Sequence, residues 1–301
     1  MIPGQTLADD TSMGPVTLRV GDLDGMTAYY SGAFAMEPLE ERGRGREQHR
    51  VLGRGTTPLV RLIGTPDLPV ADRRQPGLFH TAFLFDNPQH LAATVYRAAQ
   101  LPASRFVGSS DHLVSEAFYF TDPEGNGVEL YTDRDRSLWV HDGAEIRIAT
   151  DFLDPNEYLR RHLTQGALDA GASLPGAVGH VHLQVGDLEV ARAFYVDALG
   201  FELTQTGYSG ALFASAGGYH HHIAMNVWNS GGAGPRAASL GLADVAVTAT
   251  DAGELDALRT RLRARGIPFG SDGRSVSLAD PWGTAVTVAL PDLSTEELLA
   301  R

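Results

Sequence analysis

The sequence predicts an α+β fold of four units, each made of a strand, a helix and about three further strands. Residues 15–39 align without a gap with residues 180–204, and each segment is typical of an alternating strand, a VGDL turn and a helix. Residues 121–133 and 279–292 also repeat each other, each with an Asp-Pro-x-Gly turn between two strands. The length of 301 residues favours two domains.

Each element follows from local signals. Asp22 and Asp187 precede the two repeated helices, where a carboxylate can accept from free backbone amides, and Gly200 suits a left-handed helix end. The four units are expected at residues 15–63, 78–132, 178–228 and 240–290. We expect a first domain over 1–137, a connector with a helical NEYLRRHLTQ segment over 138–176, a second domain over 177–291 and a tail over 292–301.

Composition limits the classes of function. The net charge of −13 argues against nucleic acid or an anionic membrane as the main partner. No apolar stretch is long enough to span a bilayer, and MIPGQTLADD lacks the features of a signal peptide, so a cytoplasmic location is expected. Because the chain has no cysteine, any metal must be held by nitrogen and oxygen ligands.

Three polar residues on predicted strands form a candidate metal site. His180 shares a strand face with His182 and Gln184, whereas the alternate residues are apolar, so the polar face should line a cavity. His80 and Glu129 stand on two further strands. Alone, each would more often be a hydrogen-bonded histidine or a solvated strand end, but two histidines and one carboxylate together can hold Fe(II) and leave coordination positions open.

The segments GHVHLQV, GLFHTAFLF, SDHLVSEAFYFTDPEGNGVELY and SAGGYHHHIAMN resemble the vicinal oxygen chelate superfamily, and within it the Bacillus-type catechol 2,3-dioxygenases. The resemblance covers nearly the whole chain, and it includes a Tyr ten residues before the liganding Glu, as Tyr119 stands before Glu129. It implies βαβββ modules curled around Fe(II), with Mn(II) as the alternative metal. The implied reaction opens catechol or a substituted catechol with O2, next to the diol, to a 2-hydroxymuconic semialdehyde-type product.

The resemblance also implies catalytic residues. The family's acid–base histidine aligns with His221, whereas simple strand alternation favours His222, so both stay candidates with His221 preferred. His112 resembles a second active-site histidine, although its spacing to Tyr119 is two residues shorter than in the family. Tyr119 would hydrogen-bond a substrate oxygen.

Two units have lost the ligands. Unit four has Thr287 in place of Glu129 and Ala243 or Asp244 in place of His80, and unit one has Pro15 in place of His180. The ligands therefore fall in units two and three, which must pair across the connector if the metal interpretation is right. A rival site would lie within the first half, with Thr17 or His49 as the third ligand.

Two other functions remain open from the sequence. One is a glyoxalase-like isomerase or fosfomycin-type transferase, and the other is a metal-free binding protein of the bleomycin-resistance kind. Ring substituents and the existence of a homo-oligomer are also left open.

Overall fold

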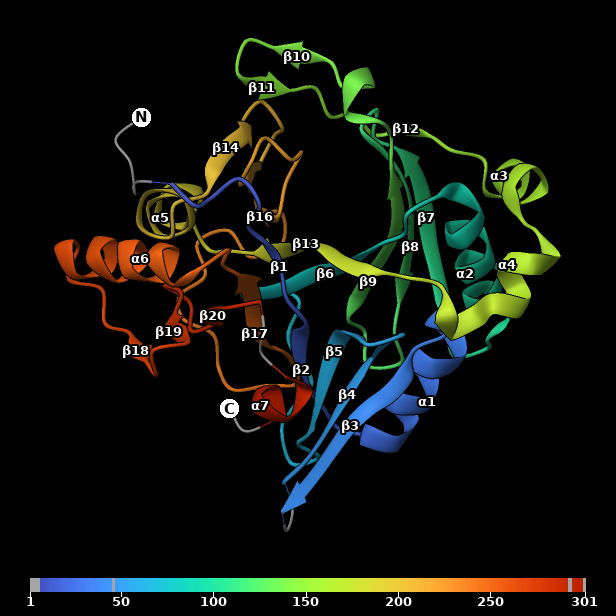
Figure 1. Ribbon diagram of the computed structural model, residues 1–301, viewed down its shortest axis with the longest axis horizontal. Helices are drawn as coiled ribbons and strands as arrows, with labels where there is room; N and C mark the ends of the chain where they lie inside the picture. Colours follow the sequence, from blue (N-terminus) through green and yellow to red (C-terminus); the bar gives the residue numbers. More distant parts are fainter. Residues whose placement is uncertain (1–5, 45–46, 292–293, 300–301) are drawn as a thin grey trace.

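The computed structural model describes residues 6–44, 47–291 and 294–299, and most of its strands form two nine-stranded mixed sheets that share one apolar core (Figure 1). The first sheet has the order β18-β19-β20-β17-β2-β5-β4-β3, with β1 paired to β17. Its strands are β1 (Ser12–Met13), β2 (Val16–Val20), β3 (Glu37–Arg44), β4 (Glu47–Arg54), β5 (Thr57–Gly64), β17 (Gly241–Thr248), β18 (Gly270–Ser271), β19 (Ser275–Ala279) and β20 (Ala285–Ala289).

The second sheet has the order β12-β7-β8-β9-β6-β13-β16-β15-β14. Its strands are β6 (Gly77–Leu84), β7 (Arg105–Asp111), β8 (Ser115–Thr121), β9 (Gly127–Asp133), β12 (Asp151–Phe152), β13 (Ala177–Gln184), β14 (Glu202–Gln205), β15 (Ala211–Ser215) and β16 (Ile223–Asn226). A separate hairpin joins β10 (His141–Asp142) to β11 (Glu145–Ile146). The predicted α+β fold of four units is confirmed.

Each large sheet combines one unit from each half of the chain. Units one and four meet where β2 pairs antiparallel with β17, and units two and three meet where β6 pairs antiparallel with β13. Units two and three therefore do pair across the connector. The division into domains at residues 137 and 177 stays a prediction, because the sheets cross that division.

The helices pack outside the sheets, with α1 and α2 on one side of the molecule and α5 and α6 on the other (Figure 1). Their bounds are α1 (Leu23–Phe34), α2 (Pro88–Gln100), α3 (Pro155–His162), α4 (Gln165–Ala170), α5 (Leu188–Arg192), α6 (Ala252–Ala264) and α7 (Thr295–Leu299). Single 3₁₀ turns form at Arg136–Leu138 and Gly171–Ser173, and α5 continues as a π-helix over Ala193–Ala198. Among the described helices, none is both long and apolar enough to cross a bilayer.

The predicted helix ends are confirmed. The Asp22 carboxylate accepts from the backbone amide of Gly25, and Asp187 accepts from that of Val190, which satisfies amides that have no partner within the helix. Gly200 follows the second repeated helix with φ of 98°, a conformation that a side chain would disfavour.

The two sequence repeats contact each other within each half. The Tyr30 hydroxyl on α1 donates to Asp122 in the first Asp-Pro-x-Gly turn, and Tyr195 donates to Asp280 in the second. Burial raises the pKa of Asp122 to about 6, although hydrogen bonds from Asn126 and other groups oppose the shift. These buried pairs bind unit one to unit two and unit three to unit four, while the sheets join the halves.

The connector and the tail both contain regular structure. The helical segment predicted in the connector forms α3 and ends at the first residue of a second helix, α4. Strand β12 extends the second sheet beside β7. Within the predicted tail, α7 lies beside β3 and β4, and part of this tail lies outside the described residues.

Candidate metal centre

Three adjacent strands carry the predicted ligands: His80 on β6, Glu129 on β9 and His180 on β13. In the sheet register, Glu129 and His180 each stand opposite Ala82 of β6, and His80 lies two residues before Ala82 on the same face. Because Ala82 has only a methyl side chain, the three longer side chains can converge above it.

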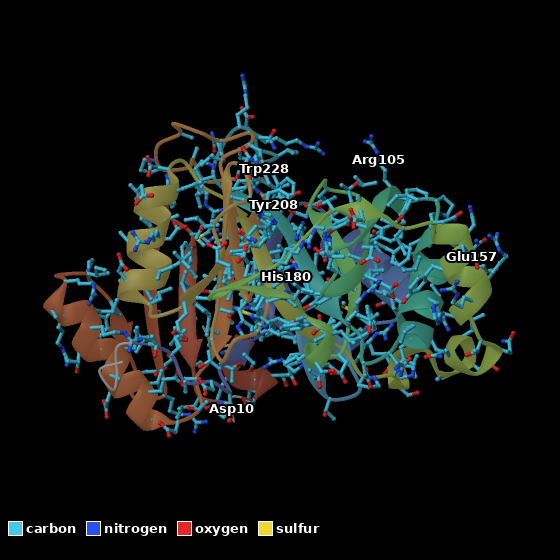
Figure 2. The ribbon with its side chains drawn as sticks, turned by 90° about the horizontal axis from the view of Figure 1, so that it is seen from above. Asp10, Arg105, Glu157, His180, Tyr208 and Trp228 are labelled. Atoms are coloured by element: carbon cyan, nitrogen blue, oxygen red, sulfur yellow. The ribbon has the colours of Figure 1, made fainter. Side chains whose placement is uncertain are left out.

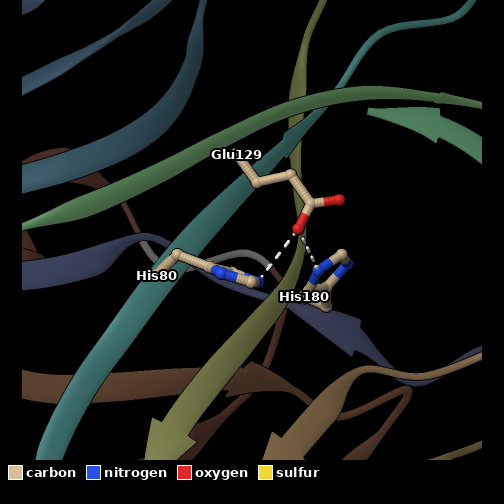
Figure 3. Close-up of side chains that lie close together, drawn as sticks. All are labelled: His80, Glu129 and His180. Carbon is tan, nitrogen blue, oxygen red and sulfur yellow. Dashed lines mark hydrogen bonds and ion pairs between the residues drawn. The ribbon is translucent and has the colours of Figure 1, made fainter. Parts of the chain in front are cut away.

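The three side chains meet at a single oxygen atom (Figure 3). Glu129 Oε2 lies 2.9 Å from His80 Nε2 and 3.2 Å from His180 Nε2. All three side chains are buried, and their ligand atoms lie within 4.8 Å of one another. Among the described residues, these three form the group whose ligand atoms lie close enough together to hold a metal ion.

The histidine nitrogens favour a cation over a simple hydrogen-bonded cluster. His80 Nε2 is buried and makes no hydrogen bond within the described residues, although Glu129 Oε2 is close by. A nitrogen that is buried without a partner costs free energy unless a ligand such as a metal ion satisfies it. The donor set therefore fits a divalent metal.

Burial and the neighbouring charged groups keep the ligand atoms of Glu129 and His180 free of protons. Burial by itself would raise the pKa of Glu129, but His180 and His80 outweigh it and hold that pKa well below its ordinary value. Burial lowers the pKa of His180 to about 4, against the opposing effect of Glu129. At neutral pH the carboxylate is ionised and His180 is neutral, which is the protonation that metal binding needs.

Tyr119 and His112 lie beside this cluster and contact each other. Tyr119 stands opposite Glu129 in the pairing of β8 with β9, and its hydroxyl lies 2.6 Å from His112 Nε2. His112 Nδ1 lies 2.5 Å from the carbonyl oxygen of Ala149, so Nδ1 carries the proton and Nε2 accepts from Tyr119. Burial and the nearby Glu129 raise the pKa of Tyr119 well above its ordinary value, so the hydroxyl stays protonated.

The histidine triplet, formed by His220, His221 and His222, precedes β16 and does not belong to it. His221 lines the pocket, and its ring centroid lies 4.0 Å from that of His180. His222 Nδ1 instead accepts from the backbone amide of Ala216, and its ring approaches Phe201 in the core. Strand alternation, which favoured His222 for the pocket, is wrong here because the regular strand begins only at Ile223. His112 likewise lies outside regular strands, between the end of β7 at Asp111 and the start of β8 at Ser115.

A cavity of about 510 Å³ opens over the cluster. Its polar floor includes His80, Glu129, Tyr119, His112 and His221. Aromatic and aliphatic side chains form much of the remaining wall: Leu78, Phe79, Val107, Val114, Phe120, Val128, Ile148, Tyr208, Phe213 and Trp228. Figure 2 shows His180 deep in the centre of the molecule, Tyr208 and Trp228 close together, and Arg105 pointing outward. The cavity thus combines a polar floor with a mainly apolar wall.

His182 also lines the pocket, although its sequence context indicated no role for it beyond its place on the polar strand face with His180. The His182 ring lies 4.9 Å from the His80 ring, and its Nε2 accepts from Asn226 Nδ2. Burial lowers the pKa of His182 well below its ordinary value, so it is neutral at neutral pH. The alternation of His180, His182 and Gln184 was the signal that could have included it.

In the other sheet, polar side chains at and near the corresponding positions hydrogen-bond to one another. Thr287 Oγ1 donates to Asp244, and Arg61 donates to His49 Nδ1 at 2.8 Å. Thr17 lies on β2 in that same sheet. The rival third ligands, Thr17 and His49, therefore lie on the sheet that does not carry His80 and Glu129.

Comparison with known proteins links this geometry to a family. Residues 12–130 and 177–287 match the model of the Glyoxalase/Bleomycin resistance protein/Dioxygenase superfamily. The chain is 33% identical over 282 residues to a catechol-2,3-dioxygenase of Bacillus subtilis (strain 168), covering 92% of this chain and 96% of the relative.

Two solved structures share the fold. Glyoxalase I from Zea mays superposes with a TM-score of 0.57 at 19% identity, covering 97% of this chain and 95% of the other. A Bacillus subtilis subsp. subtilis str. 168 protein provisionally named a dioxygenase has a TM-score of 0.63 at 12% identity, covering 96% of this chain and 87% of the other.

Proposed function

We propose that this chain, which belongs to the Glyoxalase/Bleomycin resistance protein/Dioxygenase superfamily, is an extradiol dioxygenase that opens catechol or a substituted catechol with O2. The observation that carries the proposal is the buried cluster of His80, Glu129 and His180, with His80 Nε2 unsatisfied. The similarity to a protein named catechol-2,3-dioxygenase supports it. The product would be a 2-hydroxymuconic semialdehyde or its substituted form.

The three ligands fit Fe(II), with Mn(II) as the alternative, because two imidazoles and one carboxylate leave other coordination positions open. When bound, the metal would supply the chelation of the diol oxygens and the activation of O2. Both atoms of O2 enter the product as the ring carbon–carbon bond beside the diol breaks, so no external reductant is needed. The protein side chains supply positioning and proton transfer.

His221 is the proposed acid–base residue. It lines the pocket next to His180, and burial lowers its pKa well below the ordinary value, so its imidazole is neutral at neutral pH. A neutral imidazole in this position can take a proton from a diol hydroxyl and return one during ring opening. His222 faces the core, and its proposed role is the weaker one.

Tyr119 and His112 are proposed to orient the substrate. Because the Tyr119 proton is directed to His112 Nε2, the lone pairs of the phenol oxygen remain available to a substrate hydroxyl. The aromatic wall would hold the ring of the substrate and reduce the access of water.

The test is an oxygen-uptake assay on protein purified anaerobically with Fe(II). We expect uptake of about one O2 per catechol, as the balanced reaction requires, with a yellow ring-opened product. The glyoxalase-like alternative would leave catechols unchanged and isomerise a hemithioacetal. A metal-free binding protein would hold neither iron nor activity. Either result would refute the proposed function.

A further inference from the structure

Strand β9 presents three functional groups on one face at a spacing of two residues. Glu129 belongs to the metal cluster, the Tyr131 hydroxyl lies 2.7 Å from that of Tyr219, and Asp133 ends the row. Among the described residues, the group that could hold a metal ion consists of His80, Glu129 and His180 and does not include Asp133. Its carboxylate instead reaches the histidine triplet of the other half of the chain.

Asp133 connects to His221 through a continuous pair of contacts. His220 Nε2 lies 2.9 Å from Asp133 Oδ1, and His220 Nδ1 lies 2.8 Å from His221 Nδ1. The Tyr219 hydroxyl donates to the other oxygen, Asp133 Oδ2, at 2.9 Å. His220 is fully buried, so water does not compete for either of its nitrogens.

The donor and acceptor roles follow from the chemistry of the groups. An ionised carboxylate can only accept, so His220 Nε2 must carry the proton that faces Asp133. In its neutral form His220 has one N–H, which leaves its Nδ1 as an acceptor. His221 Nδ1 must then donate to it. The remaining nitrogen of His221, Nε2, is left with a free lone pair.

We infer that Asp133 and His220 are positioning residues that hold His221 in the tautomer with Nδ1 protonated and Nε2 free to act as a base toward the pocket. The inference rests on the proposed acid–base role of His221. It assigns a task to the part of the triplet that lies outside the pocket. It also makes the base depend on both halves of the chain, because Asp133 ends β9 in the first half and the histidines come from unit three in the second.

A charged partner that orients a histidine fixes which nitrogen is free, and its removal lets the other tautomer form. With Asp133→Asn, the amide can donate to His220 Nε2, so His220 can move its proton to Nδ1. His221 Nδ1 would then accept, and its Nε2 would carry the proton. The substitution changes the shape of the site little, but the protonated His221 Nε2 can no longer accept a proton.

The direct test is nitrogen-15 NMR of histidine side chains in metal-free protein, with His221→Gln used to assign the His221 signals. We expect His221 with Nδ1 protonated and Nε2 bare in the wild-type chain, and a shift toward the Nε2-protonated form in Asp133→Asn. A His221 that carries its proton on Nε2 in the wild-type protein, or a doubly protonated His220, would overturn the inference. This readout needs no activity, so it stands apart from the proposed function.

The kinetic test uses the iron-loaded enzyme with catechol. Asp133→Asn should lower kcat by about tenfold or more, the usual scale for a residue that orients an active-site group, with KM and iron content within about twofold of wild type. The matched control is Glu116→Gln, because Glu116 on β8 has a similar exposed fraction, 22% against 24%, but pairs with Arg134. An equal loss of kcat in both variants, or a loss of iron in Asp133→Asn, would show a merely structural role.

Discussion

At the scale of single residues, His221 and His222 have opposite environments despite being adjacent. His221 lies at the pocket beside His180, whereas His222 accepts from the backbone amide of Ala216. An isolated triplet in a sequence gives no means of deciding which side chain faces the cavity. The family alignment selected His221, and the geometry agrees with that choice of pocket residue, while its catalytic role remains a prediction.

This difference predicts unequal effects of the same substitution. His221→Gln should keep its iron and lower kcat by about one hundredfold or more, because a positioned acid–base group contributes on that scale. His222→Gln should lower kcat less. Steady-state kinetics with catechol and metal analysis of both variants provide the measurement. The reverse order of the two effects would show that His222 is the base.

At the scale of elements, register is what assembles the metal centre. The sequence repeats predicted the strands, helix caps and turns, because those signals are local. The pairing of β6 with β13 was left open, since no local signal states which strands meet across a 39-residue connector over 138–176. His80, Glu129 and His180 could be placed on strand faces because their segments alternate between polar and apolar residues. Tyr119, His112 and His221 were implied only by the family resemblance, and His112 and the triplet lie outside regular strands.

Close packing behind β13 gives a prediction on stability. A Cβ atom added to Gly179 would lie 1.7 Å from the Tyr131 hydroxyl oxygen, so Gly179→Ala must displace the tyrosine next to His180. Overpacking of this kind costs about 1–3 kcal/mol of the free energy of unfolding. Denaturant unfolding measures it, with Gly166→Ala on α4 as the control because its Cβ would meet nothing within 4 Å. Equal stability of both variants would contradict the close approach.

At the scale of the whole molecule, each large sheet is built from one unit of each half of the chain. Tyr–Asp pairs hold the units of each half together, and the sheets join unit two to unit three and unit one to unit four. The sequence predicted the number of units and the loss of ligands in two of them. It could not choose between a site across the halves and one within the first half, because that choice depends on long-range pairing.

The concentration of neutral histidines in the second sheet predicts sensitivity to acid. Burial lowers the pKa of His180 to about 4 and of His222 to about 3, and it lowers those of His182 and His221 well below the ordinary value. Between these values and about 6.5, the ordinary histidine pKa, the unfolded chain binds more protons than the folded chain. Their contribution to stability is complete above pH 6.5 and is lost as the pH falls.

Asp122 and Asp280 act in the opposite direction, because burial raises the pKa of each, to about 6 for Asp122. Folding is favoured by their protonation as the pH falls through this range. Four histidines outweigh two carboxyl groups, so the metal-free protein should have a lower denaturation midpoint at pH 5 than at pH 7. Urea unfolding at the two pH values measures this. A midpoint that is equal or higher at pH 5 would contradict the neutral histidine cluster.

Iron binding by His180→Ala tests the cross-half site most directly. The measurement is iron per chain after anaerobic purification with Fe(II), beside Glu129→Ala and wild type, with circular dichroism to confirm folding. We expect about one iron in wild type and a loss in His180→Ala as complete as in Glu129→Ala, since each removes one of three protein ligands. His49→Ala, in the other sheet, should keep its iron. Retention of iron and activity by folded His180→Ala would contradict the site formed by His80, Glu129 and His180.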